Sequence, residues 1–419
     1  MRVLGVGSCV DLGDLYLGLV AEGHEVRVVA DDPAWRGPFA GLIDSEPDWW
    51  PLLPWVGKAG LILVEYADRG PWQDRLRVDG YQVIGGSALG DRLENDRAFG
   101  QSVLREVGLN TAESLGFATP AAAAEWLAAH PGRYVLKYDD SAHPTFVGEH
   151  PAGADVLFML RRAAPGQVLL MRHLDGVEVG IGGYFDGARF LEPACIDFEH
   201  KRFFPGDRGE MTPEMGTLAS YDHAGPLFEA TLARLAPRLA QARHVGYVNL
   251  NLIANEAGLW PLELTCRFGY PGHLVLASLQ RDGWGDLFGR MLDGRGDRFA
   301  SVPGWSVAIV LTIPPFPGYG AQDAPEADPP VFFHDPPQGA EAAHYHLVDV
   351  RRQDGQLFAR QRTGNVMAVT GTGMTVEAAQ AAARARAANV IVPNLRWRAD
   401  IGDRFLGQDA ARLRALGWL

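Results

Sequence analysis

The 419-residue sequence has little cysteine, a deficit of positive charge and no long apolar run. Its three cysteines, Cys9, Cys195 and Cys266, are too few for a disulfide framework or a four-cysteine zinc site, and they indicate a reducing cytoplasm. Lys and Arg number 38 against 51 Asp and Glu, a net charge of −13, which argues against nucleic acid or an anionic membrane as a partner. No stretch approaches the roughly 18 apolar residues of a membrane span, so we expect a soluble, unexported protein.

The composition is that of a folded globular protein, with 47% apolar and 21% charged residues. At about 100–200 residues per domain, the length predicts two to four domains. The first 90 or so residues predict an open parallel sheet of the α/β class, because short apolar runs alternate with a helical pattern. We expect strands at 2–7, 26–32, 61–64 and 81–86, and a helix at 12–22.

Two glycines follow the first predicted strand, in the pattern Gly5-x-Gly7, and Asp31 lies about 20 residues further on. This arrangement resembles a dinucleotide-binding turn, but Val10 occupies the position of its third glycine. A tight turn between strand and helix explains the same residues. The motif therefore gives only weak support to a dehydrogenase.

The remainder of the chain predicts an antiparallel unit, a long amphipathic helix, and a small α+β domain after a Pro/Gly-rich linker at 314–330. Expected strands are 133–140, 167–176, 177–185, 188–198, 247–255, 259–268, 306–313, 345–351 and 366–370; expected helices begin near 94 and at 120–130, 226–244 and 375–390.

Polar residues recur at two-residue spacing in the strands between 247 and 268. Asn249 and Asn251 share one face of the first strand, and Glu263 and Thr265 share one face of the second. Two paired strands that present oxygen ligands toward one cavity suit a hard cation such as Mg²⁺. The alternative is that these residues lie at a solvated sheet edge, although leucines flank Glu263 on both sides.

Nine segments, in chain order, are similar to motifs of the ATP-grasp ligases, and specifically of the phosphoribosylamine–glycine ligases. The segments are LENDRAF (93–99), NTAES (110–114), YVLKYDD (134–140), LLMRHLDGVEVG (169–180), EHKRFFPGDRGEMTPEMG (199–216), LELTCRFGYPG (262–272), FFHDP (332–336), GNVMAVTGTGMTVEAAQAAA (364–383) and LRWRADIG (395–402).

The resemblance implies an ATP-grasp fold with an N-terminal Rossmann-like domain at 1–104, an ATP-grasp domain at 105–305 that includes a lid at about 118–185, and a small C-terminal α+β domain at 306–419. It also implies a reaction. ATP phosphorylates a carboxylate, and an amine then displaces phosphate from the acyl phosphate to give an amide. ATP and Mg²⁺ (or Mn²⁺) would be the cofactors, and positioning and charge neutralisation would provide most of the catalysis.

The resemblance assigns roles to individual residues. Lys201, Arg202 and Arg267 are the expected catalytic residues, with Arg267 suited to a carboxylate or an acyl phosphate. Glu263, Asn251 and Thr265 are the expected metal ligands, although Thr265 stands where the family has Asn. The expected nucleotide-binding residues are Lys137, Arg97, Arg172, His173, Leu174 and Glu178. Each also has a plainer explanation, such as a surface lysine for Lys137 or a structural ion pair for Arg267.

Departures from the family pattern concern the acceptor. The first loop reads GVGSCVDLGD (5–14) and lacks the family's Arg, Glu and His, while Tyr270-Pro271-Gly272 replaces Asp-Pro-Glu. The lid loop at 139–150 lacks the family's Gly-Lys-Gly, and His143 is the residue that could partly replace the lysine. We therefore expect a small, glycine-like amino acid and an amine other than phosphoribosylamine as substrates. A divergent phosphoribosylamine–glycine ligase and an inactive nucleotide-binding relative remain alternatives. We expect the protein to be a monomer or a homodimer.

Overall fold

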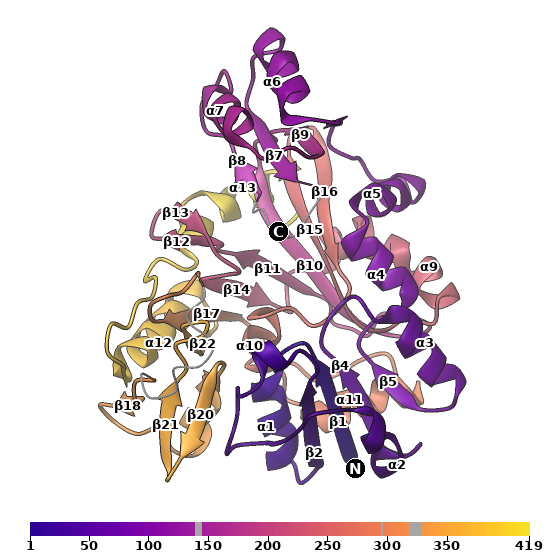
Figure 1. Ribbon diagram of the computed structural model, residues 1–419, viewed down its shortest axis with the longest axis vertical. Helices are drawn as coiled ribbons and strands as arrows, with labels where there is room; N and C mark the ends of the chain where they lie inside the picture. Colours follow the sequence, from indigo (N-terminus) through magenta and orange to yellow (C-terminus); the bar gives the residue numbers. More distant parts are fainter. Residues whose placement is uncertain (139–144, 295, 319–327) are drawn as a thin grey trace. The chain divides into compact units, whose positions relative to one another are not determined.

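The computed structural model describes residues 1–138, 145–294, 296–318 and 328–419 (Figure 1). The predicted lid loop at 139–150 and the predicted linker at 314–330 each lie partly outside the described residues, and His143 lies outside them. The chain forms two compact units. The first contains 1–103, 178–251 and 263–419, and the second contains 104–177 and 252–262.

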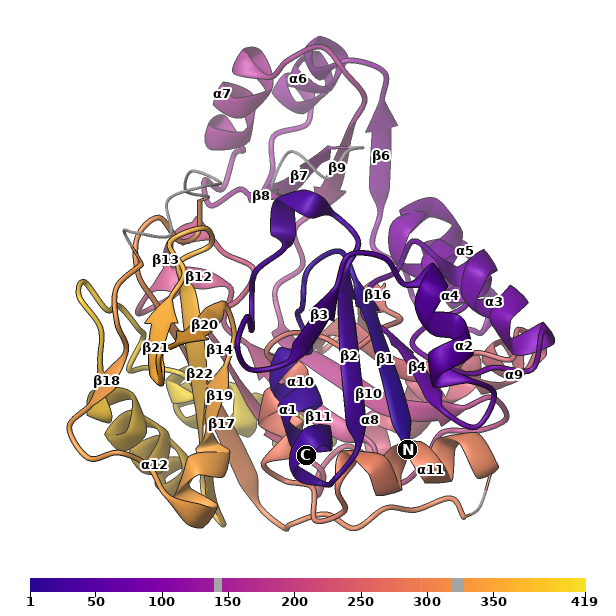
Figure 2. The same ribbon diagram turned by 60° about the horizontal axis from the view of Figure 1, so that its bottom comes forward.

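The N-terminal part of the first unit is a five-stranded parallel sheet in the order β3-β2-β1-β4-β5, as predicted (Figure 2). All four residues of the LILV strand are buried, which is typical of a parallel strand covered on both faces. The elements are β1 (Arg2–Gly7), α1 (Gly13–Ala21), β2 (Glu25–Ala30), β3 (Asp44–Glu46), α2 (Leu53–Val56), β4 (Leu61–Val64), α3 (Gly70–Val78), β5 (Gln82–Ile84) and α4 (Ala88–Asn95).

The central sheet has eight strands in the order β16-β15-β10-β11-β14-β17-β22-β19. Residues 252–262, at the ends of β15 and β16, belong to the second unit. The strands are β10 (Val177–Asp186), β11 (Cys195–Glu199), β14 (Gly216–Ser220), β15 (Val245–Asn255), β16 (Gly258–Thr265), β17 (Trp305–Thr312), β19 (Tyr345–Leu347) and β22 (Asn365–Gly373).

Helices and two-stranded hairpins complete the first unit. The Ala-rich helix α12 packs along β17 and β22 of the central sheet (Figure 1). The remaining elements are β12 (Arg202–Phe204), β13 (Arg208–Met211), α8 (Gly225–Ala230), α9 (Ala236–Gln241), α10 (Gly272–Ala277), α11 (Trp284–Asp293), β18 (Phe332–Phe333), β20 (Val350–Gln353), β21 (Gln356–Ala359), α12 (Val376–Asn389), β23 (Val390–Ile391) and α13 (Ala410–Ala415).

Three predicted elements differ clearly in extent. The strand expected at 345–351 is divided between β19 and β20, which belong to different sheets. The helix expected at 226–244 is broken into α8, a 3-10 helix at Leu232–Leu235, and α9. Thr231 leaves the helical conformation at φ −132° and ψ −86°, and the proline near the start of α9 cannot donate a helical hydrogen bond. The strand expected at 188–198 begins only at Cys195, because Pro193 lacks the N–H group that a ladder needs.

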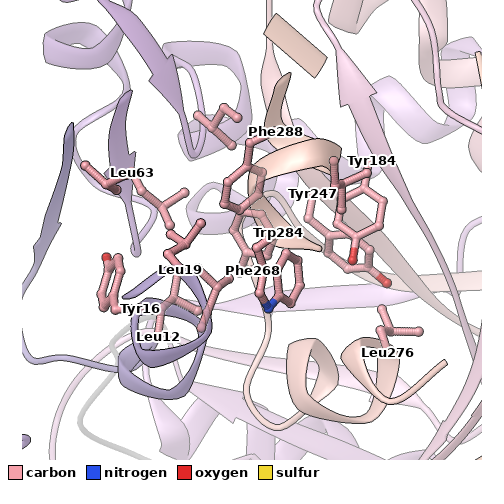
Figure 3. Packing of buried hydrophobic residues seen from close by; sticks show 14 of the residues in the cluster. Leu12, Tyr16, Leu19, Leu63, Tyr184, Tyr247, Phe268, Leu276, Trp284 and Phe288 are labelled. Atoms are coloured by element: carbon pink, nitrogen blue, oxygen red, sulfur yellow. The ribbon is translucent and has the colours of Figure 1, made fainter. Parts of the chain in front are cut away.

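A large apolar core joins the N-terminal sheet to the central sheet within the first unit. Phe268, Trp284 and Phe288 lie at its centre, with Leu12 and Leu19 of the N-terminal part nearby (Figure 3). The rings of Phe268 and Trp284 are 6.2 Å apart between centroids, in an edge-on arrangement. Phe268 belongs to the sequence Arg267-Phe268-Gly269, called the RFG motif below. Since Phe268 follows Arg267 directly, this core anchors the segment that carries the motif.

The second unit is a four-stranded antiparallel sheet in the order β6-β9-β7-β8, covered by α6 and α7. Its elements are β6 (Ser114–Phe117), α6 (Pro120–Ala129), β7 (Tyr134–Tyr138), β8 (Phe146–Val147), α7 (Ala154–Arg162) and β9 (Val168–Arg172), and α5 (Arg97–Glu106) spans both units. In the part of the chain that the structure describes, none of the helices combines the length and apolar character that a membrane crossing requires.

Candidate active site

Acidic and amide side chains line adjacent strands of the central sheet. On β11, Asp197 and Glu199 share a face because they are two residues apart. Gly180 of β10 lies opposite Asp197, and continuing this antiparallel register by two residues places Glu178 opposite Glu199. Gly180 leaves room for this arrangement, because a Cβ atom there would overlap the Asp197 carboxylate.

Two asparagines of β15 orient the carboxylates of β11. Asn249 Nδ2 donates to Asp197 Oδ2 at 2.7 Å, and Asn251 Nδ2 lies 3.4 and 3.3 Å from the two carboxylate oxygens of Glu199. The second oxygen of Asp197 is buried and has no hydrogen-bond partner among the described residues. The amides therefore fix the carboxylates in place while leaving acceptor capacity unused.

Lys201 connects these carboxylates to the predicted metal ligand. Its Nζ lies 2.8 Å from Glu199 Oε2 and 3.4 Å from Glu263 Oε1. Arg97, at the start of α5, approaches Glu263 from the other side, with 3.8 Å between Nη2 and Oε2. The structure thus brings four predicted residues, Lys201, Glu263, Arg97 and Asn251, into one group around Glu199.

Negative charge exceeds positive charge in this group. Burial tends to lower the pKa of Lys201, but Glu199, Glu263 and Glu178 outweigh it and raise that pKa well above its usual range. Burial also raises the pKa of Glu178 and Glu214, with Glu199 adding to the effect in both. An additional cation would relieve this repulsion.

Asp197 responds in the same way. Burial and the neighbouring Glu199 raise its pKa to about 7, against the opposing effects of Asn249 and Lys201. Glu214 accepts a hydrogen bond from the Thr217 hydroxyl on β14. Both carboxyl groups interact electrostatically with Lys201, so several acids lie near this lysine.

The chemistry of these donors fits Mg²⁺ bound together with phosphates. Within the described ranges, no group of three or more His, Cys, Asp or Glu residues is arranged to hold a metal ion by itself. Mg²⁺ in nucleotide sites commonly needs only one or two carboxylates, with water and phosphate oxygens as the other ligands. Glu263 and Asn251 lie at this group, and Thr265 ends the same strand as Glu263.

The segment after Lys201 is tied to the C-terminal residues of the chain. Arg398, which is almost fully buried, donates to the Arg202 carbonyl at 2.7 Å and to Asp207 Oδ1 at 3.0 Å. Asp400 binds Arg398 through both oxygens and accepts from the Gly206 N–H at 2.8 Å. These contacts connect the LRWRADIG segment (395–402) to the residues that follow Lys201. The sequence alone did not indicate this structural role.

Two predicted catalytic arginines have partners within the protein. Arg202 Nη1 donates to the Gly209 carbonyl at 2.7 Å, across the β12–β13 hairpin. Arg267 Nε donates to Glu94 Oε1 at 3.0 Å, which is the structural ion pair left open as its alternative explanation. Glu94 also accepts from the Cys266 N–H at 2.8 Å, so the acid orients the whole RFG segment.

Four of the predicted nucleotide-binding residues lie in the second unit. Lys137 is buried in β7, on the sheet face opposite the core residues Tyr134 and Leu136. Arg172 ends β9, and His173 and Leu174 follow it, with the His173 N–H donating to the Arg133 carbonyl at 3.0 Å. Burial, with Arg133 nearby, lowers the pKa of His173.

The first β–α turn is not arranged as a dinucleotide site. Asp31, the expected ribose ligand of that motif, accepts from the Tyr66 hydroxyl at 2.6 Å and pairs with Arg69 at 2.7 Å. Glu65, which sequence reasoning missed, is buried beside the same turn. The dehydrogenase alternative therefore has no structural support at this position.

No family model matches the chain. The chain is 25% identical to the phosphoribosylamine–glycine ligase of Corynebacterium ammoniagenes, over 96% of this chain and 97% of that protein. It is 24% identical to the ligase of Neisseria meningitidis serogroup B, over 80% and 81%. A match to the Nostoc ligase, at 28% identity, spans only about half of each protein (49% and 52%).

Solved structures give the same result for the fold. A Thermotoga maritima phosphoribosylamine–glycine ligase superimposes with a TM-score of 0.71 at 21% identity, covering 96% of this chain and all of that one. The biotin carboxylase domain of Hydrogenobacter thermophilus 2-oxoglutarate carboxylase, solved with MgADP, gives 0.62 at 11% identity, covering 94% and 91%. The chain therefore has the ATP-grasp fold and resembles the phosphoribosylamine–glycine ligases along most of its length.

Proposed function

We propose that this protein is an ATP- and Mg²⁺-dependent carboxylate–amine ligase. The observation that supports this most is the placement of Lys201 between Glu199 and Glu263, close to the buried acids Asp197 and Glu214. Such a group suits a reaction in which a metal-bound triphosphate adds cations and phosphates together. Bound Mg²⁺–ATP would supply the phosphoryl group for activating the carboxylate.

The residues of the chain would then bind and orient the reactants. Glu263, with Asn251 and Thr265, would hold the metal, and Glu178 would accept hydrogen bonds from the nucleotide ribose. Lys201 would neutralise phosphate charge as it leaves its pairing with Glu199. Arg97, Lys137, Arg172, His173 and Leu174 would contact the nucleotide, and Arg202 and Arg267 the carboxylate side.

The proposed reaction has two steps. A carboxylate oxygen attacks the γ-phosphorus, the bond to the β-phosphate oxygen breaks, and ADP leaves with its electrons. An amine nitrogen then attacks the acyl carbon, phosphate leaves, and the nitrogen loses a proton to give an amide. The fixed partial and full charges of the site would stabilise both transition states.

For the substrates, we propose a small, glycine-like amino acid and an amine other than phosphoribosylamine. Support comes from the altered first loop, which contains Asp11 and Asp14 instead of basic residues. Tyr270, which replaces an acid after the RFG motif, donates its hydroxyl to Asn365 Oδ1 at 2.9 Å and so belongs to the C-terminal part. At these positions, where we propose that the acceptor binds, the sequence differs from the family pattern.

Phosphoribosylamine–glycine ligase itself is the second candidate. Similarity to the Corynebacterium enzyme, at 25% identity over 96% of the chain, is the observation that favours it. The two candidates share their first step and differ only in the acceptor.

A panel assay separates them. Purified protein is incubated with ATP, Mg²⁺, one amino acid and one amine, phosphate release is followed, and the product mass is determined. We expect phosphate release with a small amino acid and an amine that carries no phosphate. Efficient turnover of phosphoribosylamine with glycine supports the second candidate, and absence of ADP formation with every pair supports an inactive relative.

A further inference from the structure

Glu65 lies at the carboxyl end of β4, beside the turn that joins β1 to α1. β1 and β4 are neighbouring parallel strands at the centre of the sheet order β3-β2-β1-β4-β5, where chain connections run outward in both directions. In open parallel sheets, ligands bind in the crevice at this position, outside the carboxyl ends of the strands. Glu65 is therefore placed where a ligand of the N-terminal domain would reach the backbone.

The Glu65 carboxyl group takes up the hydrogen-bond donors of the turn. The Asp11 N–H donates to Oε2 at 2.7 Å, and the Tyr16 hydroxyl donates to Oε1 at 2.7 Å. The Leu12 N–H also bonds to the carboxylate. Only 3% of Glu65 is exposed; its bond with Tyr16 is buried, and its bond with the Asp11 N–H is partly buried.

Two details show how closely the carboxyl group fits. A Cβ atom at Gly7 would overlap the carboxyl group, so only glycine allows the side chain to lie against the backbone there. α1 has no side-chain cap of its own, since Leu12 occupies the N-cap position. Glu65 thus supplies, from another element, an acceptor for the amides of Asp11 and Leu12, the two residues directly before α1.

Backbone amides at a helix N-terminus, next to a glycine turn, are the groups that proteins use to bind phosphate. Here a side chain already occupies that position. We propose that Glu65 is a specificity-determining residue: it fills the phosphate position of the β1–α1 turn and so excludes acceptors that carry a phosphate ester. This inference rests on the proposed function and defines its acceptor as an amine without a phosphate group.

The neighbouring charges act in the same direction. Asp11 is exposed at the turn, and its carboxylate would repel a phosphate. Asp14, in the first turn of α1, is held by His346 through a 2.7 Å contact to Nδ1 and by the Leu347 N–H at 3.2 Å. Asp11 and Asp14 therefore place negative charge beside the turn, which disfavours the binding of a phosphate there.

Calorimetric titration with ribose 5-phosphate and with inorganic phosphate tests the proposal, with ribose as the phosphate-free control. The proteins are the wild type, Glu65→Gly, and Glu46→Gly as a matched control at the exposed end of β3. We expect no detectable phosphate binding by the wild type or by Glu46→Gly. Glu65→Gly should bind both phosphates at least about tenfold more tightly than the wild type, a gain of about 1.4 kcal/mol.

Two results would overturn the inference. One is a wild type that binds ribose 5-phosphate but not ribose, which can be measured whether or not any variant folds. The other is a folded Glu65→Gly, or the milder Glu65→Ser, with no gain in phosphate affinity, as expected if Glu65 only caps α1. Neither titration contains ATP, Mg²⁺ or an amine, so ADP formation in the panel assay tests the ligase proposal separately.

Discussion

Buried carboxylates occur at two places in the first unit, and they are balanced in different ways. Around Lys201, Glu199 and Glu263 have a lysine partner, while nearby acids have raised pKa values. At the β1–α1 turn, the donors to Glu65 among the described residues are neutral: the amides of Asp11 and Leu12 and the hydroxyl of Tyr16. The first group has acid in excess and can accept more positive charge, whereas the second has its hydrogen bonds complete.

This difference separates a site built to receive ligands from one that is closed to them. An acidic group that also contains a lysine gains from binding a metal and a phosphate together, because each new charge finds an opposite partner. The donors around Glu65 already bond to its carboxyl group, so a second anion at this turn would gain no stabilisation from them. We therefore expect substitutions in the Lys201 group to affect the reaction, and substitutions at Glu65 to affect substrate choice and pH dependence.

The largest effect is expected from Glu263→Gln. An amide keeps the shape of the side chain but loses the charge that would hold the metal, so kcat should fall by about 10³-fold, or ~4 kcal/mol. ADP formation at saturating Mg²⁺ measures this, with circular dichroism to confirm the fold. Glu377→Gln, on the exposed first turn of α12, is the control and should retain full activity. Near-normal activity in folded Glu263→Gln would exclude it as a ligand.

Lys201→Met should reduce stability. Removing the lysine takes the cation from Glu199 and leaves Glu263 with the more distant Arg97. Because Glu263 is 44% exposed, the loss should cost about 2 kcal/mol in urea unfolding. Added Mg²⁺ should recover part of the loss, since it can replace the missing charge. The Lys58→Met variant is the control, because Lys58 is exposed and contacts only neutral groups in the structure described, the Asp79 carbonyl and the Tyr81 ring. A stability change equal to that of the control would show that the acids do not depend on Lys201.

Glu65→Gln should change how stability depends on pH. Burial and the nearby Asp11 raise the pKa of Glu65 to about 8, so the folded protein holds a proton that the unfolded chain releases near its ordinary pKa. Between those values the unfolded state binds fewer protons, and wild-type stability should fall as pH rises.

The fall attributable to Glu65 should be on the order of 2 kcal/mol between pH 5 and pH 8, within the limit of about 1.4 kcal/mol per pH unit for one proton. The unfolding free energies of the wild type and of Glu65→Gln are measured at several pH values, and the difference between the two curves gives the contribution of Glu65. Tyr16 and Cys9 have pKa values raised above this window by burial, so they do not contribute. Parallel pH curves would mean that Glu65 is charged throughout.

Gly180→Ala should have the smallest of these effects. A Cβ atom would push against Asp197 and disturb its bond to Asn249, at a cost of about 1–2 kcal/mol. Gly116→Ala, in β6, is the matched control, because a Cβ there meets nothing within 4 Å. Thermal unfolding of both variants measures the difference. Equal stability would show that Asp197 moves freely and is not held by its neighbours.

Local sequence pattern was enough for most of the fold. Uniformly apolar runs such as 61–64 predicted the parallel sheet, and the helix found at Val376–Asn389 and the β15–β16 turn lie where they were expected. The errors arose where one residue breaks a longer pattern. Thr231 divides an amphipathic stretch that periodicity alone cannot interrupt, and Pro193 delays the start of β11.

The site was predictable only in part. Lys201 and Glu263 could be named because each lies in a recognisable motif, although 62 residues separate them. Arg267 could not be assigned to Glu94 from the sequence, because the partner is 173 positions away. Glu65 gave no signal at all, since its partners Asp11 and Tyr16 lie 54 and 49 residues distant, and only folding of the sheet brings them together.

Trapping of the acyl phosphate tests the central claim most directly, because it does not require the acceptor to be known. Hydroxylamine takes the place of the amine and converts an acyl phosphate to a hydroxamate. With ATP, Mg²⁺ and a small amino acid, we expect hydroxamate and ADP in equal amounts, and neither product with Glu263→Gln. ADP without hydroxamate, or no ADP with any amino acid, would contradict the assignment of this protein as a carboxylate–amine ligase.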